Sequence, residues 1–146
     1  MPDVATRYLL CKLAREFGLR VYGLFDSNPY GVRILCIYRY GSMNKSYDYR
    51  NLITPNISWL GIKPTDLGTY GIPDDEKCRV PMTTNDRNLC QSLIDAEYLK
   101  DNAKWRRELQ CMKKIGTKTE IEAFYTFGYK SLANVFIAHK LQQWKL

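Results

Sequence analysis

Hydrophobic positions recur about every four residues at the start of the chain. Leu9, Leu13 and Phe17 follow this spacing, and Asp3 is a residue type that caps helices. Gly18, directly after the last of them, is typical of a helix end. This pattern predicts a helix from about Asp3 to Phe17.

The next segment changes from a helical to an extended pattern. Residues 20–25 are apolar, partly β-branched or aromatic and bounded by turn residues, which predicts a short buried strand that ends at Asp26. Asn28 followed by Pro29 is a strong helix start, and Gly41 is the predicted end of that helix. The residues expected to face inward are Val32, Leu35 and Tyr38. Helix, strand, acidic turn and helix in this order form half of a parallel α/β layer.

The remainder of the chain is predicted to be mostly helical. Residues 57–60 are a second, weaker strand candidate, and the Gly- and Pro-rich residues 61–81 predict loops with at most a single helical turn. Further helices are expected from Thr83 or Thr84 through Leu93, from Asn102 through Met112, over 117–127 and over 130–142. We predict one α/β domain, residues 1–146, with a parallel sheet and a helical C-terminal part. Two strands are few for a parallel sheet, so the chain resembles part of a larger one.

Composition is that of a globular protein and excludes several classes. The chain is 45% hydrophobic and 25% charged, without a fixed-period repeat. Its apolar runs are only a few residues long, far below a membrane span, and no signal sequence is recognisable. The five cysteines form no CxxC pair, and their odd number suits a disulfide framework poorly. We expect a nuclear or cytoplasmic protein.

The net charge of +7 is unevenly distributed along the chain. Residues 1–60 carry eight Lys or Arg against four acids, residues 61–100 five against seven, and residues 101–146 nine against four. Basic ends are suited to a polyanion such as DNA, which binds through phosphate contacts and counterion release. The alternative is an ordinary soluble domain with excess lysine.

The segment from Asp26 to Gly31 is the sharpest candidate for chemistry. A carboxylate at the C-terminal end of a strand, before a helix, lies where α/β folds usually bind ligands. Such a carboxylate can bind Mg²⁺, a hard cation that prefers oxygen ligands. The alternative is a plain capping turn.

Several ordered motifs can be recognised along the chain, namely Pro2 to Arg7, Val21 to Gly31, Ile34 to Met43, Trp59 to Gly61, Pro64 to Leu67, Lys118 to Ala123 and Lys140 to Gln142. Together they resemble the family of topoisomerase VI A subunits and the meiotic double-strand-break protein. The likeness spans nearly the whole chain. The stretch from Cys36 to Met43 is closer to the eukaryotic meiotic members.

The resemblance implies a Toprim (Rossmann-like) fold and a Mg²⁺ site. In the family, an upstream glutamate and a D-x-D pair hold the metal. Asp26 matches the first aspartate of the pair, whereas the second is replaced by the neutral amide of Asn28. The counterparts of the glutamate strand, and of the winged-helix domain with the cleaving tyrosine, would lie upstream of Met1. The chain is therefore expected to be the partial, C-terminal Toprim portion.

The resemblance also implies function. Family members cleave double-stranded DNA as a homodimer of A-type subunits, with ATP hydrolysis in a separate B-type subunit, and the expected location is the nucleus. We assign none of the eleven tyrosines as nucleophile; Tyr30, Tyr38 and Tyr40 are predicted to be helix-face or packing residues. Arg33 and Arg39, on the helix after the acidic turn, are the DNA-binding candidates.

Two hypotheses remain open. The first is a DNA-cleaving, topoisomerase-like subunit, with the meiotic type preferred. The rival is a catalytically inactive Toprim relic that binds DNA or a partner without cutting, which Asn28 favours. His139 is predicted to be a surface or half-packed residue rather than a base. The basic run Lys104, Arg106, Arg107, Lys113 and Lys114 is either a solvated helix face or a DNA or partner surface.

Overall fold

The N-terminal half forms the predicted α/β unit. The computed structural model of the chain describes residues 2–42, 49–128 and 130–143, so Met43, at the end of one recognised motif, lies outside it. Helix α1 (Val4–Glu16) is followed by β1 (Tyr22–Gly23), α2 (Pro29–Tyr40) and β2 (Ser58–Trp59). The two strands pair in parallel, with Tyr22 opposite Ser58 and Gly23 opposite Trp59. The predicted parallel sheet is confirmed, although its strands are shorter than expected.

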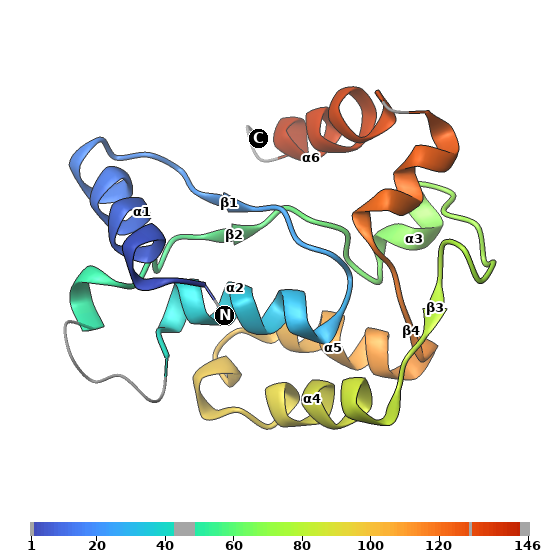
Figure 1. Cartoon of the computed structure of the whole chain (residues 1–146), viewed down its shortest axis with the longest axis horizontal. Helices are drawn as coiled ribbons and strands as arrows, with labels where there is room; N and C mark the ends of the chain where they lie inside the picture. Colours follow the sequence, from blue (N-terminus) through green and yellow to red (C-terminus); the bar gives the residue numbers. More distant parts are fainter. Residues whose placement is uncertain (1, 43–48, 129, 144–146) are drawn as a thin grey trace.

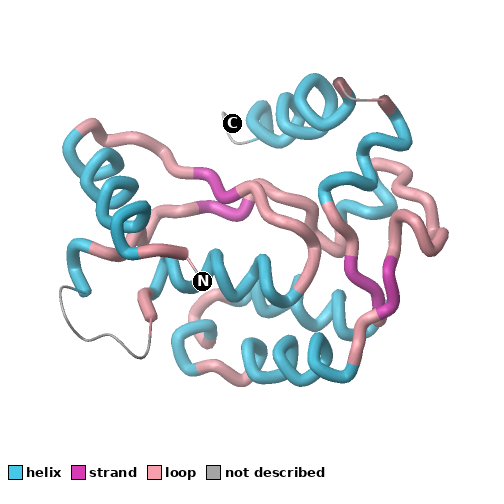
Figure 2. The backbone as a smooth tube through the Cα atoms, in the orientation of Figure 1, coloured by secondary structure: helices cyan, strands magenta, loops and turns pink. Residues whose placement is uncertain are grey.

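The C-terminal half is mainly helical, as predicted (Figure 2). In order, it contains α3 (Asp66–Thr69), β3 (Val80–Pro81), α4 (Thr84–Ile94), η2 (Glu97–Leu99), α5 (Ala103–Ile115), β4 (Thr117–Lys118), η3 (Ile121–Phe127), η4 (Leu132–Ile137) and α6 (Ala138–Gln143). A short 3₁₀ turn, η1 (Tyr49–Asn51), lies between α2 and β2. Strands β3 and β4 form a separate antiparallel pair, which the sequence did not predict.

Local sequence explains where α2 begins and ends. The Asn28 side chain accepts a hydrogen bond from the Gly31 N–H, and Pro29 occupies the first helical position. Gly41 ends the helix with a φ of 92°, a conformation that favours glycine. Val32 and Leu35 are fully buried, as predicted, and each stabilises the fold by about 1.5–3 kcal/mol.

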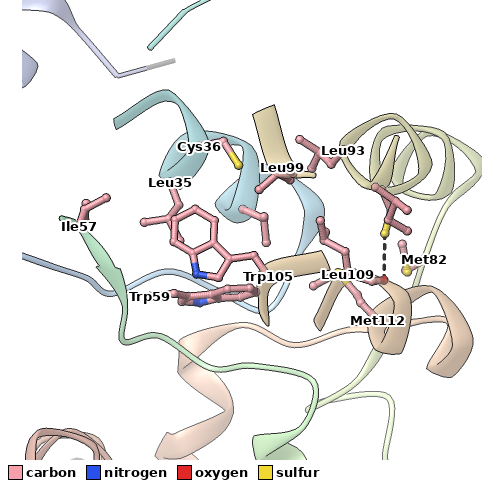
Figure 3. Close-up of a cluster of buried hydrophobic side chains, with 13 residues drawn as sticks. Leu35, Cys36, Ile57, Trp59, Met82, Leu93, Leu99, Trp105, Leu109 and Met112 are labelled. Carbon is pink, nitrogen blue, oxygen red and sulfur yellow. Dashed lines mark hydrogen bonds between the residues drawn. The ribbon is translucent and has the colours of Figure 1, made fainter. Parts of the chain in front are cut away.

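The larger core joins β2, α2, α4 and α5. Figure 3 shows its residues, and Figure 1 shows α2 between the parallel strands and α4. The Trp59 and Trp105 rings meet edge to face, with centroids 6.4 Å apart. This geometry suits their quadrupoles and adds about 1 kcal/mol to the burial energy. A second cluster, around Ile62, Phe124 and Phe136, packs the C-terminal helices on the segment that follows β2.

The prediction of a helix over 117–127 is wrong for the first residues of this range. Gly116 takes a left-handed conformation, φ 76°, and ends α5. Thr117 and Lys118 then pair as β4 with Val80 and Pro81. Residues Ile121–Phe127 form η3, a 3₁₀ helix rather than an α-helix. Pairing with a strand distant in the sequence overrides the local helical pattern here.

The spacing of hydrophobic residues predicted helix α1 correctly, but the helix face that carries these residues is exposed to solvent. Leu9 is 56% exposed, Leu13 38% and Phe17 66%. The buried face instead carries Arg7, whose Nη2 donates to the Leu52 carbonyl at 3.0 Å, and Cys11. A row of large exposed apolar side chains favours association. None of the described helices is long and apolar enough to span a membrane.

We therefore predict that this chain in isolation self-associates through α1. Sedimentation velocity should show a concentration-dependent shift, and the melting temperature should depend on protein concentration. Replacing Leu9 and Phe17 together with Gln should abolish both effects. The matched control replaces Val135 and Phe127, 58% and 48% exposed on other elements, and should leave association unchanged. A monomeric parent with a concentration-independent melt would contradict this prediction.

Candidate functional site

The acidic turn lies between β1 and α2 and is held by its own side chains. Asp26 Oδ1 accepts a hydrogen bond of 2.8 Å from the Ile121 N–H, and Asn28 Oδ1 accepts one of 2.7 Å from the Gly31 N–H. The Asp26 and Asn28 side chains are half-buried. The carboxylate is thus fixed through one oxygen, while Oδ2 accepts no hydrogen bond from the described part of the chain.

A backbone bridge holds this turn against a distant segment. The Ser27 N–H donates to the Thr119 carbonyl at 2.8 Å, and the Thr119 N–H donates back to Ser27 at 3.0 Å. Both residues are buried, Ser27 at 2% and Thr119 at 1% exposure. The bridge brings the Ile121 N–H to the Asp26 carboxylate. Sequence patterns did not predict this contact, although Lys118 to Ala123 was among the motifs that resembled the family.

An ion pair anchors the segment that carries Thr119. Lys118 Nζ lies 3.0 Å from Asp86 Oδ2, and Asp86 also closes the capping box of α4 with Thr83. Burial on its own raises the pKa of Asp86, but hydrogen bonds from Thr83 and Lys118 outweigh it and hold this pKa below its usual value. Because the carboxylate is 2% exposed, losing Lys118 would leave a buried charge without its cation.

Two glycines let the backbone close around Asp26. A Cβ at Gly61 would collide with the backbone oxygen and nitrogen of Phe25, the residue before Asp26. A Cβ at Gly31 would lie 2.9 Å from the Asp26 carbonyl oxygen. The absence of a side chain at Gly61 lets the segment after β2 pack directly on the end of β1. The absence of one at Gly31 lets the start of α2 approach the Asp26 carbonyl.

This geometry suits part of a Mg²⁺ site. Asp26 Oδ2 is a hard oxygen donor, and Asn28 offers an amide oxygen that already caps α2. Across residues 2–42, 49–128 and 130–143, no three His, Cys, Asp or Glu side chains form a group that could hold a metal ion. Asp26 can supply one carboxylate ligand for a metal ion. Further ligand oxygens would have to come from groups outside the described residues.

The two predicted DNA-binding arginines are not brought together. Arg33 is exposed, whereas Arg39 is half-buried and donates from Nη1 to the Ile57 carbonyl at 3.0 Å. The Arg39 guanidinium also lies 5.3 Å from the Trp105 ring centroid. The two arginines are six positions apart on α2, so they occupy different faces of the helix. Arg39 is engaged within the fold, and Arg33 is the freer candidate.

The remaining candidates lie apart from the turn. His139 is exposed on α6, with Nδ1 2.8 Å from the Tyr70 hydroxyl. Tyr30 is 49% exposed, whereas Tyr38 and Tyr40 are half-buried. Tyr40 Oη accepts a hydrogen bond from Asn102 at 3.1 Å. These contacts agree with the predicted packing roles of Tyr38 and Tyr40.

Comparison with known proteins gives a consistent result. The family model for the Toprim domain of the topoisomerase 6 A subunit and Spo11 matches residues 1–141. The A subunit of DNA topoisomerase 6 from Arabidopsis thaliana is 47% identical over 142 residues, which are 97% of this chain and 33% of that protein. Meiotic recombination protein SPO11 of Mus musculus is 37% identical over 142 residues, 97% of this chain and 35% of that protein. The chain spans about a third of the length of these relatives.

The contact between Gly61 and Phe25 gives a direct stability test. Gly61→Ala should lower the free energy of unfolding by about 3 kcal/mol, because the new Cβ can be accommodated only by moving backbone. Gly68→Ala is the matched control, since no atom lies within 4 Å of its added Cβ, and it should change stability by less than about 1 kcal/mol. Urea denaturation of both variants measures the difference. Equal stabilities would show that this close approach does not hold the turn.

Proposed function

The chain belongs to the family of topoisomerase 6 A subunits and Spo11 through its Toprim domain, and from this premise we propose that it supplies the metal-binding part of a DNA-cleaving subunit. The observation that carries the proposal is the Asp26 carboxylate, which is fixed through one oxygen at the C-terminal end of β1. This is the strand end at which α/β folds bind ligands.

Asp26 is the principal metal ligand in this proposal. The Ile121 N–H orients its carboxylate, and the bridge between Ser27 and Thr119 prevents the turn from moving away. Asn28 mainly caps α2 and adds at most a weak carbonyl dipole. Bound at this turn, Mg²⁺ would neutralise charge on a DNA phosphate and help to position it.

Cleavage of DNA needs a nucleophilic tyrosine and a further metal-binding carboxylate. Neither has a counterpart among the motifs of this chain that resemble the family. In a transesterification, a tyrosine oxygen attacks the DNA phosphorus and the sugar oxygen leaves, so the phosphodiester energy is retained in a phosphotyrosyl bond. The resemblance places this tyrosine, and the remaining metal carboxylate, outside the matched motifs. We propose that the chain contributes the metal part of a shared site and does not cleave DNA alone.

The proposed partners follow from the family. The substrate is double-stranded DNA, contacted by Arg33 beside the acidic turn. Two A-type subunits would act on two strands as a homodimer, a B-type subunit would hydrolyse ATP, and the location would be the nucleus. The identity to the Arabidopsis topoisomerase, 47%, exceeds the 37% to mouse SPO11. Overall identity thus favours a topoisomerase role over the meiotic role that the stretch from Cys36 to Met43 suggested.

A second function is favoured by one specific residue. Asn28 replaces an acid with a neutral amide, and its oxygen already accepts the Gly31 N–H. A Toprim relic that binds DNA or a partner without metal chemistry would need no acid at this position. Affinity for Mg²⁺ distinguishes the two functions, because only the first requires it.

Calorimetric titration with Mg²⁺ tests the metal assignment in a protein that also carries the upstream half expected from the family resemblance. Two unit charges about 4 Å apart interact by about 4 kcal/mol at an effective dielectric of about 20, and even about 1.4 kcal/mol changes affinity tenfold. Asn28→Asp should therefore strengthen Mg²⁺ binding about tenfold with little effect on stability, because Asp caps helices as well as Asn. Asp26→Ala should abolish binding. Asp101→Ala, which removes an exposed carboxylate elsewhere, is the control. If Asp26→Ala binds like the parent, the turn is only structural.

The proposed inactivity of the isolated chain has its own test. Incubation with supercoiled plasmid and Mg²⁺ should yield no protein covalently joined to broken DNA ends, because the proposal places the nucleophile and the second carboxylate outside this chain. Denaturing electrophoresis of nuclease-treated, labelled DNA detects such adducts. An adduct above background would assign the nucleophile to one of the eleven tyrosines and refute the shared-site proposal.

A further inference from the structure

A groove of about 1000 Å³ opens at the end of α2 opposite to the acidic turn. It lies between the last turn of α2, strand β2 and the first half of α5. Four cations line it, namely Arg39, Lys63, Lys104 and Arg107, against two carboxylates, Asp101 and Glu108. We call it the basic groove. Because α2 has twelve residues, about 18 Å separate the two helix ends.

The positive charge of the basic groove is only partly compensated. Glu108 accepts hydrogen bonds from Thr65, at 3.2 Å from its N–H and 2.7 Å from its hydroxyl. Burial lowers the pKa of Lys63, and the charges of Lys140 and Lys104 lower it further, despite raising effects of Asp66 and Glu108. Four cations against two carboxylates leave an excess of positive charge along the groove, which an anionic ligand would neutralise.

The N-terminus of α5 adds to the positive character of the groove. Asn102 caps α5, so the positive end of that helix dipole also faces the groove. The excess of cations and this helix N-terminus together favour an anionic ligand.

A row of cations continues from the groove along α5. Lys104, Arg107 and Lys114 occupy positions i, i+3 and i+10, which share one helix face with Cys111. Burial and Glu108 raise the pKa of Cys111, whereas Lys114 and Arg107 act in the opposite direction, as expected if both cations flank the thiol. The row extends over about 15 Å, too long for a single phosphate group.

We propose that the basic groove and this row on α5 bind the phosphodiester backbone of duplex DNA, as a contact face distinct from the Asp26 turn. The inference rests on the proposed function in that DNA is the substrate. One DNA strand offers a phosphate about every 3.4 Å of helix axis, so a row about 15 Å long meets several of them. An acidic peptide is the competing ligand, and it lacks the fixed phosphate spacing that a rigid duplex presents to a row of cations on one helix face.

Fluorescence anisotropy with labelled duplex DNA, in EDTA, tests the groove without the metal. The double variant Lys104→Glu, Arg107→Glu should weaken binding at least about tenfold, and should reduce the slope of log K against log salt by about 1.8 for two lost phosphate contacts. The control Lys77→Glu, Lys130→Glu has the same charge change at exposed sites outside the groove, and should lose much less affinity and keep its slope. Circular dichroism checks the fold of each protein.

The outcomes separate this inference from the proposed function. Equal losses in the double variant and in the control would overturn the proposal for the groove. A parent without affinity for duplex DNA would also overturn it, whereas the proposed metal site is decided by the Mg²⁺ titration. Asp26→Ala should bind DNA in EDTA like the parent, even if the metal assignment fails. Poly-glutamate is the competing ligand. If it binds in a groove-dependent manner while duplex DNA fails to displace it, the groove is a protein-binding site and the inference is wrong.

Discussion

Two reciprocal backbone hydrogen bonds between Ser27 and Thr119 hold together parts of the chain that are far apart in the sequence. Because both residues are buried, breaking the pair would leave peptide groups unsatisfied away from water. The bridge brings the Ile121 N–H within hydrogen-bond distance of the Asp26 carboxylate. The ion pair between Lys118 and Asp86 anchors the segment that carries Thr119. On the other side, Gly61 packs directly on the Phe25 backbone. The acidic turn is therefore constrained from both sides.

Helix α2 connects two regions of opposite chemical character. Its N-terminus begins at Asn28, next to the carboxylate of Asp26, and its last turn carries Arg39 into the basic groove. A metal bound at the first end would contact DNA phosphate at the reacting position, whereas the cations at the second would contact backbone further away. The rigid helix would keep these contacts at a fixed separation. Positioning and reaction would then depend on different residues and could be altered separately.

Local sequence was sufficient to predict most helices and strands, but largely insufficient to predict the contacts around Asp26. Caps and glycines predicted α2 almost to the residue, because Asn28 acts through its own side chain and Gly41 through its own backbone conformation. The 3.6-residue period predicted α1 but not which face is buried, since the row from Leu9 to Phe17 is exposed. The start of the segment over 117–127 was assigned wrongly, because its pairing partners are distant in the sequence. For the same reason Asp26 was identified as a candidate while the Ile121 N–H that holds it was not.

Binding of Mn²⁺, a paramagnetic substitute for Mg²⁺ with a similar preference for oxygen ligands, tests directly whether Asp26 is the metal ligand. In amide-resolved NMR spectra, a bound Mn²⁺ broadens the signals nearest to it first. Substoichiometric Mn²⁺ should broaden the amides of Ser27, Asn28 and Ile121 before those of the basic groove, and Mg²⁺ should reverse the effect. In Asp26→Ala this local broadening should disappear. Broadening that begins elsewhere, or that persists in Asp26→Ala, would contradict the claim.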